Sequence, residues 1–174
     1  MEEAIKAQWP SNERKDDLHF FPLEGLLPAG EALSVNTVYL IVSLVSTNSV
    51  SGNPILLQRP MTELQMRLLL PLLESPHYCP HEVLYASLFY SYRGLLAGLF
   101  SSDCTAREEW QTTIEEKRVF LQRAPESGSL KRDLKPLYNA LSKLRSKLRP
   151  FGLEIAISTS RSAYALISLP VPRQ

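Results

Sequence analysis

Leucines recur at a helical spacing near the C-terminal end of the sequence, and they constrain the fold more than any other feature. Five of them are separated by steps of three, four, three and four residues, which is the period of one helix face. They are Leu134, Leu137, Leu141, Leu144 and Leu148. Pro150 and Gly152 follow and indicate where the helix ends. The spacing therefore predicts one amphipathic helix over 131–149.

Positive charge is concentrated in the same segment. Between Lys131 and Arg149 there are seven Lys or Arg residues and one acid, so the segment carries +6 while the whole chain carries +1. Residues 1–130 carry a net charge of −6, and residues 131–174 carry +7. A basic C-terminal part of this kind indicates a polyanionic partner.

The composition is typical of a folded domain. The chain has 174 residues, and its hydrophobic fraction of 44% is high enough for a packed core. No apolar run is long enough to cross a membrane, and the first residues lack the pattern of a signal peptide. Cys79 and Cys104 are therefore expected to be free thiols in a reducing compartment. We expect a cytoplasmic protein with no membrane partner and no cofactor.

The first third of the sequence predicts a small β-structure. Residues 1–30 are expected to be a tail with an apolar, proline-broken arm, which includes 20–28 and packs on the domain or on a partner. A β-branched and aromatic run predicts a strand over 35–45, and 55–57 predicts a second strand. Together these two strands would form an N-terminal β-hairpin.

Three helices are expected before the basic one. Their predicted ranges are 62–75, 81–92 and 105–122. Phe89 is expected to point inward from the second of them. Gly94 and Gly98 are expected to loosen the chain after that helix, and 124–129 has the composition of a loop.

Two further strands follow the basic segment. They are predicted at 153–157 and 163–169, as a hairpin around 158–162. A helical trio whose last member is basic, followed directly by a β-hairpin, is typical of a winged helix-turn-helix. The fold class expected for 31–170 is therefore α+β, a winged helix-turn-helix with an N-terminal β-hairpin, a helical insertion at 93–128 and a C-terminal β-hairpin wing.

Two stretches resemble the effector domain of OmpR/PhoB-type response regulators and related transcription activators. Residues 57–76 resemble the family's strand and its L-T-x-x-E-x-x-L-L-x-x-L helix start. Residues 137–152 resemble its I-x-x-L-R-x-K-L recognition helix, and 155–166 resemble its I-x-T-x-R-G-x-G-Y-x-L wing. The match covers residues 56–169. It implies a winged-helix domain that binds double-stranded DNA and regulates transcription.

The sequence departs from that family in three ways. The wing, at 161–164, is one residue shorter and lacks the two glycines. About 35 additional residues precede the basic helix, and they include Trp110 and an acidic face with Glu108, Glu109, Glu115 and Glu116. No receiver domain is expected, because only some 30 residues precede the first predicted strand.

The helix face opposite the leucines carries short polar and cationic side chains, which suit a major groove. The predicted DNA-binding residues are Arg132, Lys135, Asn139, Ser142, Lys143 and Ser146, with Lys147 and Arg149 beside them and Arg161 at the tip of the wing. Asn can pair with adenine edges, and Lys can reach guanine or phosphate. Arg145 lies at the edge of the leucine stripe and is expected to form a structural ion pair with an acid on another helix.

Other interpretations remain open at this point. A basic amphipathic helix is often only a solvated surface helix. The chain could also be an adaptor or subunit of a larger, nucleic-acid-bound complex that binds a protein partner, or a second copy of itself, through 18–28 or 104–123. RNA binding has less support, because only Tyr138 offers a stacking ring near the basic helix.

Metal binding and catalysis have little support in the sequence. His77, Cys79, His81 and Cys104 are suitable residue types for zinc, but their spacing is unusual for a tetrahedral site. Adjacent glutamates on a helix diverge by 100°, so the acidic pairs are expected to be solvated. The motifs of the common hydrolases and phosphate-binding enzymes do not occur. We expect neither a metal site nor an enzyme.

Overall fold

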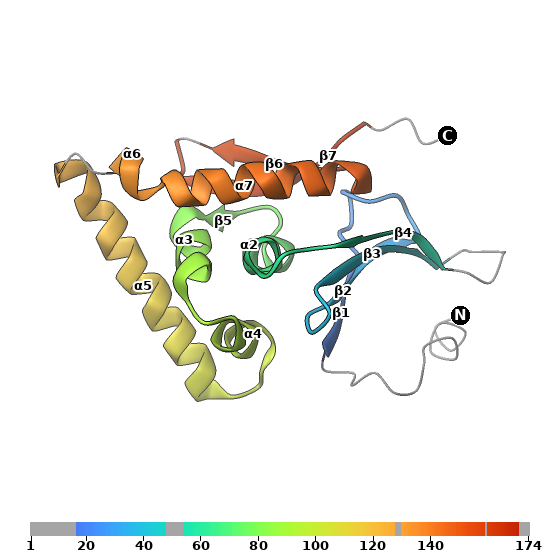
Figure 1. Cartoon of the computed structure of the whole chain (residues 1–174), viewed down its shortest axis with the longest axis horizontal. Helices are drawn as coiled ribbons and strands as arrows, with labels where there is room; N and C mark the ends of the chain where they lie inside the picture. Colours follow the sequence, from blue (N-terminus) through green and yellow to red (C-terminus); the bar gives the residue numbers. More distant parts are fainter. Residues whose placement is uncertain (1–16, 48–53, 128–129, 159, 171–174) are drawn as a thin grey trace. The chain divides into compact units, whose positions relative to one another are not determined.

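A computed structural model of the chain describes residues 17–47, 54–127, 130–158 and 160–170 (Figure 1). The protein has a mixed α+β fold, as predicted. It divides into two compact units between Thr62 and Glu63. The expected boundary at residue 30 is therefore misplaced, because the predicted tail contributes a strand to the first unit.

The first unit is a four-stranded antiparallel sheet in the order β1-β2-β3-β4. Its strands are β1 (Leu18–Phe21), β2 (Glu31–Asn36), β3 (Ile41–Ser46) and β4 (Ile55–Pro60). The register aligns Phe21, Leu33, Leu44 and Leu57 in one row across the sheet, and the first three of these are buried. The expected N-terminal hairpin is thus a complete small sheet.

Two sequence predictions are only partly right in this unit. The apolar arm predicted at 20–28 is packed, since Phe21, Leu23 and Leu27 are buried, but it begins in strand β1, where Phe21 pairs with Leu33. The strand predicted over 35–45 is two strands joined by a tight turn at 37–40. The side chain of Asn36 stabilises this turn, because its Oδ1 accepts hydrogen bonds from the backbone N–H of Val38 and Tyr39 at 3.0 and 2.9 Å.

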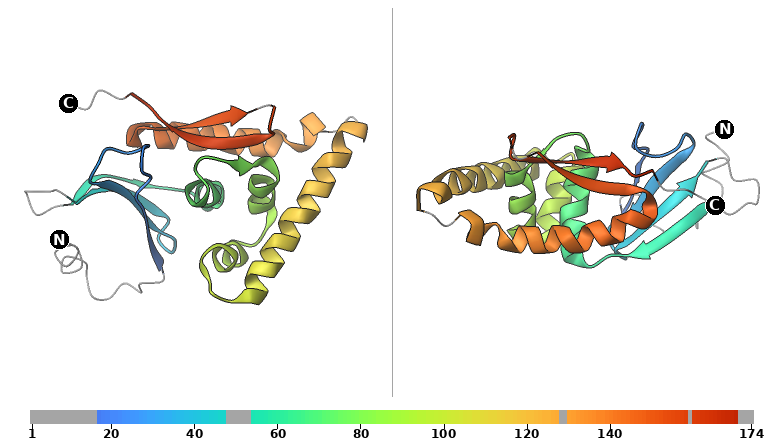
Figure 2. Two further views of the ribbon diagram at one scale, coloured as in Figure 1. Left: turned by 180° about the vertical axis from the view of Figure 1, so that it is seen from behind. Right: turned by 90° about the horizontal axis from the view of Figure 1, so that it is seen from above.

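The second unit contains all the described α-helices (Figure 1, Figure 2). They are α2 (Glu63–Glu74), α3 (His81–Phe89), α4 (Tyr92–Phe100), α5 (Cys104–Ser127), α6 (Leu130–Asp133) and α7 (Lys135–Leu148), followed by the 3₁₀ helix η2 (Arg149–Phe151). Helix α2 packs against α3 and α7, and α5 runs beside α3 and α4. The helix predicted over 62–75 is confirmed as α2.

The segment around Gly94 and Gly98 is a helix, not a loosened chain. Gly98 faces Trp110, and a Cβ atom at Gly98 would lie 2.5 Å from the Trp110 Cβ. The glycine therefore permits close packing of α4 against α5. Helix α5 also continues to Ser127, through most of the loop predicted at 124–129, whose last two residues lie outside the described part of the chain.

The predicted basic helix over 131–149 is divided in two. Helix α6 ends at Asp133, α7 begins at Lys135, and the buried Leu134 lies between them. Pro136 explains the break, because a proline suits the first turn of a helix but cannot donate a backbone hydrogen bond within one. At the other end, Gly152 adopts a left-handed conformation with φ of 80° and ends the helix.

The C-terminal hairpin is confirmed and has a third strand. Strands β6 (Leu153–Ser158) and β7 (Ala163–Ser168) pair in antiparallel fashion, and β7 also pairs with β5 (Cys79–Pro80). Two backbone bonds extend this junction, from His81 N to Ser162 O at 2.9 Å and from Leu166 N to Pro76 O at 2.7 Å. The hairpin is therefore fixed to the segment that leads into α3.

Candidate nucleic-acid interface

Helix α7 has a completely apolar inner face and a polar outer face. The buried residues of the helix are Leu137, Ala140, Leu141, Leu144 and Leu148. The exposed residues that were expected to read DNA are Lys135, Asn139, Ser142, Lys143 and Ser146. The helix contains no Asp or Glu, so its outer face is uniformly cationic or neutral.

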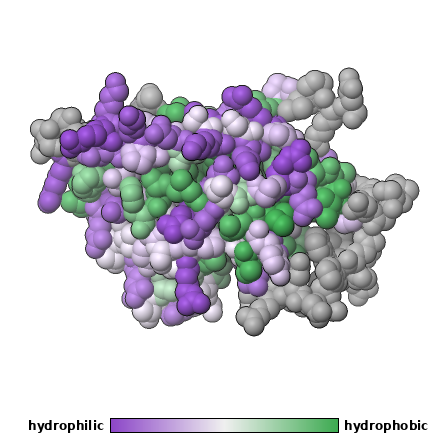
Figure 3. Space-filling model, viewed as in Figure 1, coloured by the Kyte–Doolittle hydropathy of each residue, from purple (hydrophilic) through white to green (hydrophobic). Residues whose placement is uncertain are grey.

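The side chains of this outer face are available to a ligand. Within the described part of the chain, Lys135, Asn139 and Lys143 form no side-chain hydrogen bond or ion pair. The Ser146 hydroxyl lies 3.5 Å from the Ser142 carbonyl oxygen of its own helix. Figure 3 shows hydrophilic residues along the edge of the molecule formed by α6 and α7.

The other predicted DNA-binding residues are not equivalent to those of the α7 face. Arg132 belongs to α6 and does not share the face of α7, and its Nε lies 4.0 Å from Asp133 Oδ1. Lys147 is half-buried and has an interaction partner. Arg161 is exposed in the turn between β6 and β7. The structure thus distributes the predicted set over α7, the preceding α6, the 3₁₀ helix η2, which begins with Arg149, and the hairpin.

Arg145 and Arg149 share one carboxylate. Arg145 Nε lies 3.5 Å from Glu154 Oε1, and Arg149 Nε lies 3.6 Å from Glu154 Oε2. Glu154 Oε1 also accepts a hydrogen bond from the Ile155 N–H at 3.0 Å. Arg145 does form an ion pair, but its partner is on strand β6 and not on another helix as predicted. The pairing was missed because the distance between α7 and β6 depends on the turn at η2.

A buried phenol lies close to the same arginine. The pKa of Tyr164 is raised to about 12, mainly by burial and also by Tyr138, while Arg145 opposes the rise. Tyr164 therefore stays protonated at neutral pH and presents no charge of its own to Arg145. Glu154 is the anion that offsets the charge of this guanidinium.

The tip of the hairpin has an unusual backbone conformation. Ser162, next to Arg161, has a φ of 49°, in the left-handed region that favours glycine. The β6–β7 turn therefore has a left-handed residue that is not a glycine. The Ser162 carbonyl accepts the hydrogen bond from His81 N, which holds the tip in place.

The structure does not bring the residues considered for zinc together as a set of ligands. Among the described residues, no group of three or more His, Cys, Asp or Glu is placed to hold a metal ion. The pKa of the Cys79 thiol is raised to about 12, mainly by burial and also by the charge of Glu82, so this group remains a neutral thiol at neutral pH. Burial lowers the pKa of His81, although Glu82 opposes that shift.

Helices α3 and α5 form an exposed aromatic cluster that the sequence pattern did not predict. Phe89 is 54% exposed, although it was predicted to point inward, and Phe120 is 43% exposed. The buried Tyr85 ring lies between them, with ring-centre distances of 4.9 Å to Phe89 and 5.8 Å to Phe120. The Lys117 Nζ lies 5.5 Å from the centre of the Phe89 ring. Figure 3 shows a hydrophobic area over this part of the molecule.

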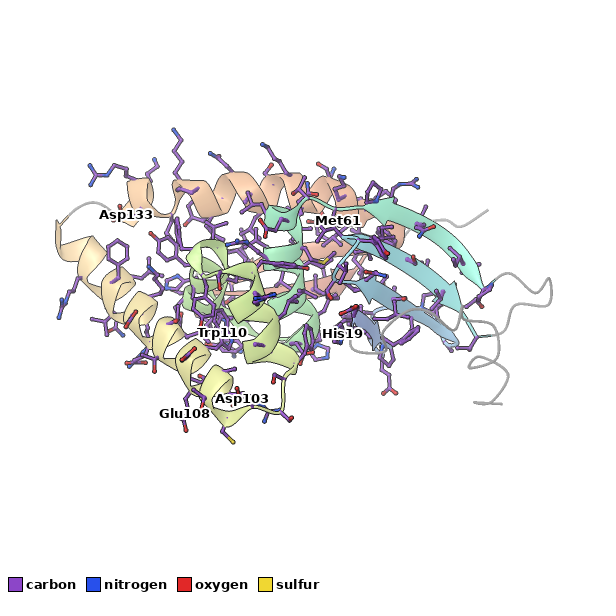
Figure 4. The ribbon with its side chains drawn as sticks, turned by 60° about the horizontal axis from the view of Figure 1, so that its bottom comes forward. His19, Met61, Asp103, Glu108, Trp110 and Asp133 are labelled. Carbon is purple, nitrogen blue, oxygen red and sulfur yellow. The ribbon has the colours of Figure 1, made fainter. Side chains whose placement is uncertain are left out.

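Helix α5 uses its tryptophan for internal packing. Trp110 is 3% exposed and lies in a cluster with Ala86 and Leu95. In Figure 4, Glu108 on the same helix points away from the body of the unit. The expected acidic face is exposed, and one of its members, Glu115, pairs with Arg118 on the next turn. Trp110 is therefore not available for the dimer contact considered for 104–123.

None of the described helices is both long and apolar enough to cross a membrane. Comparison of the chain with family models, with curated proteins and with solved structures finds no match.

Proposed function

We propose that this chain is a winged helix-turn-helix protein that binds double-stranded DNA and regulates transcription. Helix α7 would enter the major groove, and Arg161 in the β6–β7 turn would contact the backbone or the minor groove. In this arrangement, Asn139 and Lys143 would face the base edges.

The observation that carries the proposal is the outer face of α7. Five polar or cationic side chains are exposed along it, directly opposite a face that is completely buried. The side chains of Ser142 and Ser146, at the centre of this face, are short, so the helix backbone can approach a groove closely. A face without acids attracts the phosphate backbone along its whole length.

The order of the elements supports the same proposal. Helices α2, α3 and α7 form a trio, and the hairpin β6–β7 follows the last of them. The segment that was expected as an insertion contains α4 and α5, between α3 and the basic helix. This order also supports the proposed relationship to OmpR/PhoB-type effector domains, which have a small N-terminal sheet as well.

Fluorescence anisotropy with a labelled mixed-sequence duplex at low salt tests the proposal. We expect binding that weakens steeply as the salt concentration rises, since released counterions drive it. Lys143→Glu should weaken binding at least about tenfold, because it places a negative charge against phosphate. Arg123→Glu, an equal change of charge on exposed α5, is the matched control and should have a much smaller effect.

Selection from random oligonucleotides would then identify the preferred site. If Asn139→Ala loses the preference for one base at a single position of the selected motif, this would support recognition of bases by α7. No binding of the wild-type chain to duplexes at low salt would contradict the proposed function. If Lys143→Glu and Arg123→Glu weakened duplex binding equally, α7 would not be the helix that contacts the DNA.

A second candidate function is favoured by the aromatic cluster of Phe89 and Phe120. Large exposed rings beside a cation are frequent in protein interfaces, so the chain could be a protein-binding adaptor. Deleting 18–28 is not a clean test of this idea, because it would remove strand β1 from its sheet. A partner whose binding is lost with Phe120→Ser and retained with Lys143→Glu would favour the adaptor.

A further inference from the structure

We propose that Arg145 and Arg149 together form a binding site for one phosphate group, and that Glu154 positions both guanidinium groups for it. The site lies where α7 meets β6. In the proposed function its ligand is a phosphodiester of the DNA backbone, so the inference rests on that function. It adds Arg145, which the sequence had assigned a purely structural role, to the contact with the ligand.

The geometry places two like charges beside a single carboxylate. The Arg145 and Arg149 Nε atoms each approach a different oxygen of Glu154, at 3.5 and 3.6 Å. The two arginines are four residues apart, so both project from the same face of the helix end. The side chain of Glu154 is only 20% exposed, which limits the positions that it can take.

Both guanidinium groups retain unused hydrogen-bond donors. Each has five N–H groups in a fixed plane, and here only the Nε edge faces Glu154. Within the residues that the structure describes, neither side chain forms any other ion pair or hydrogen bond. The Nε of Arg145 is buried and lacks a hydrogen bond among these residues. The Nη groups can therefore bind phosphate oxygens in the bidentate manner that arginine favours.

The charges at this site are not balanced without a ligand. Two guanidinium groups and one carboxylate leave a local charge of +1, which a phosphodiester would neutralise. A single structural ion pair would need only Arg145. The side chain of Arg149 is 64% exposed, and an exposed ion pair contributes little to folding, so stability alone does not explain the second arginine.

The salt dependence of duplex binding measures this contact. Anisotropy titrations with one fixed duplex at several salt concentrations should show that Arg149→Gln reduces the slope of log K against log salt by ~0.9 for the one phosphate lost. Binding should weaken by a similar factor for unrelated sequences, because phosphate contacts carry no sequence information. Arg149→Lys should restore part of the slope. Arg123→Gln on α5, with the same loss of charge, should leave the slope unchanged.

A double-mutant cycle tests the positioning role of Glu154. If Glu154 holds the guanidinium in place, Arg149→Gln should weaken binding less in a Glu154→Gln chain than in the wild type. Strictly additive effects would contradict that role. Thermal unfolding by circular dichroism should show that each variant is folded, and Arg145→Lys provides a milder change at the partly buried position.

The failures of the two proposals are distinguishable. If the wild-type chain binds duplexes and Arg149→Gln leaves the slope unchanged, the phosphate site is wrong and the proposed function stands. If the wild-type chain binds no duplex at low salt, both are wrong.

Discussion

Helices α7 and α5 are both amphipathic, yet they are held in the second unit in different ways. Helix α7 has 14 residues and buries five of them along one continuous face. Helix α5 has 24 residues, and of those whose side chains are described only Trp110 and Leu121 are buried. The shorter helix is thus fixed along its length, and the longer one is fixed near two points.

The outer faces of these helices differ as well. The exposed face of α7 has no acid, whereas the exposed face of α5 mixes acids and bases, with the Glu115–Arg118 pair as one example. A mixed face is what solvation alone requires of a surface helix. The acid-free face of α7 is not needed for solubility, so this face is the better candidate for binding a charged ligand.

The largest expected difference between the α7–hairpin region and α5 is in the rate at which their cysteines are alkylated. Cys79 lies in β5, beside the hairpin that follows α7, and Cys104 begins α5. The raised pKa of Cys79, about 12 against an ordinary 9.0, keeps this thiol protonated at pH 8. Its alkylation by iodoacetamide should be roughly a thousandfold slower than that of an ordinary exposed thiol. Mass spectrometry of the native protein should find label on the exposed Cys104 only.

Unfolding in guanidinium should make both cysteines react, and Cys104→Ser should remove the label from the native protein. Labelling of Cys79 and Cys104 at similar rates in the native state would show that Cys79 in β5 is accessible to solvent. The two thiols would then not differ in reactivity as predicted.

Truncation of the α7 core should have the next largest effect. Leu144 is completely buried, so Leu144→Ala should lower the free energy of unfolding by ~2–5 kcal/mol through lost burial and a cavity. Urea denaturation followed by circular dichroism measures this loss. Val119→Ala, at a half-buried position of α5, is the comparison and should cause a much smaller loss. Equal losses at the two positions would contradict the idea that α7 is held more firmly.

The contact between α4 and α5 can be broken by a single methyl group. Gly98→Ala places a Cβ 2.5 Å from the Trp110 Cβ, so the two helices must move apart. We expect a loss of ~1–3 kcal/mol in the free energy of unfolding from this overpacking. Helix propensity alone predicts the opposite, a gain of ~1 kcal/mol. A more stable Gly98→Ala variant in urea denaturation would therefore disprove the close approach.

The smallest effect is expected at the tip of the hairpin. Ser162→Gly removes the strain of a left-handed residue, with φ of 49°, and should raise stability by up to ~1 kcal/mol. The bond from His81 N is retained because it uses the backbone oxygen of Ser162. Thermal unfolding measures the change, and Ser160→Gly in the same turn is the control. A less stable Ser162→Gly variant would mean that the serine side chain contributes to the turn.

Patterns with a local cause were predicted well from the sequence. The burial of the leucine face of α7 follows from side-chain spacing, and the hairpin at 153–168 follows from two short apolar runs around a polar turn. The turn at 37–40 was hidden within a β-branched run, although Asn36 was an available signal for it. Pro136 was likewise an available signal for the break after α6.

Features that depend on distant segments could not be predicted in this way. Strand β5 has only two residues, and it exists because Cys79 pairs with Tyr164. The shared carboxylate of Glu154 depends on how η2 turns the chain back toward α7. The exposure of Phe89 depends on the position of α5, which leaves that side of α3 partly uncovered. None of these follows from the period of a single element.

The central strand of the three-stranded sheet is β7, the latest of its strands in the chain. During synthesis, Cys79 and Pro80 emerge some eighty residues before the strand that pairs with them, and β6 also waits for it. Closing such a long loop is slow, so this sheet should assemble after the helices have collapsed. A chain that is truncated before residue 163 would contain every described helix but would lack β7, the central strand of this sheet.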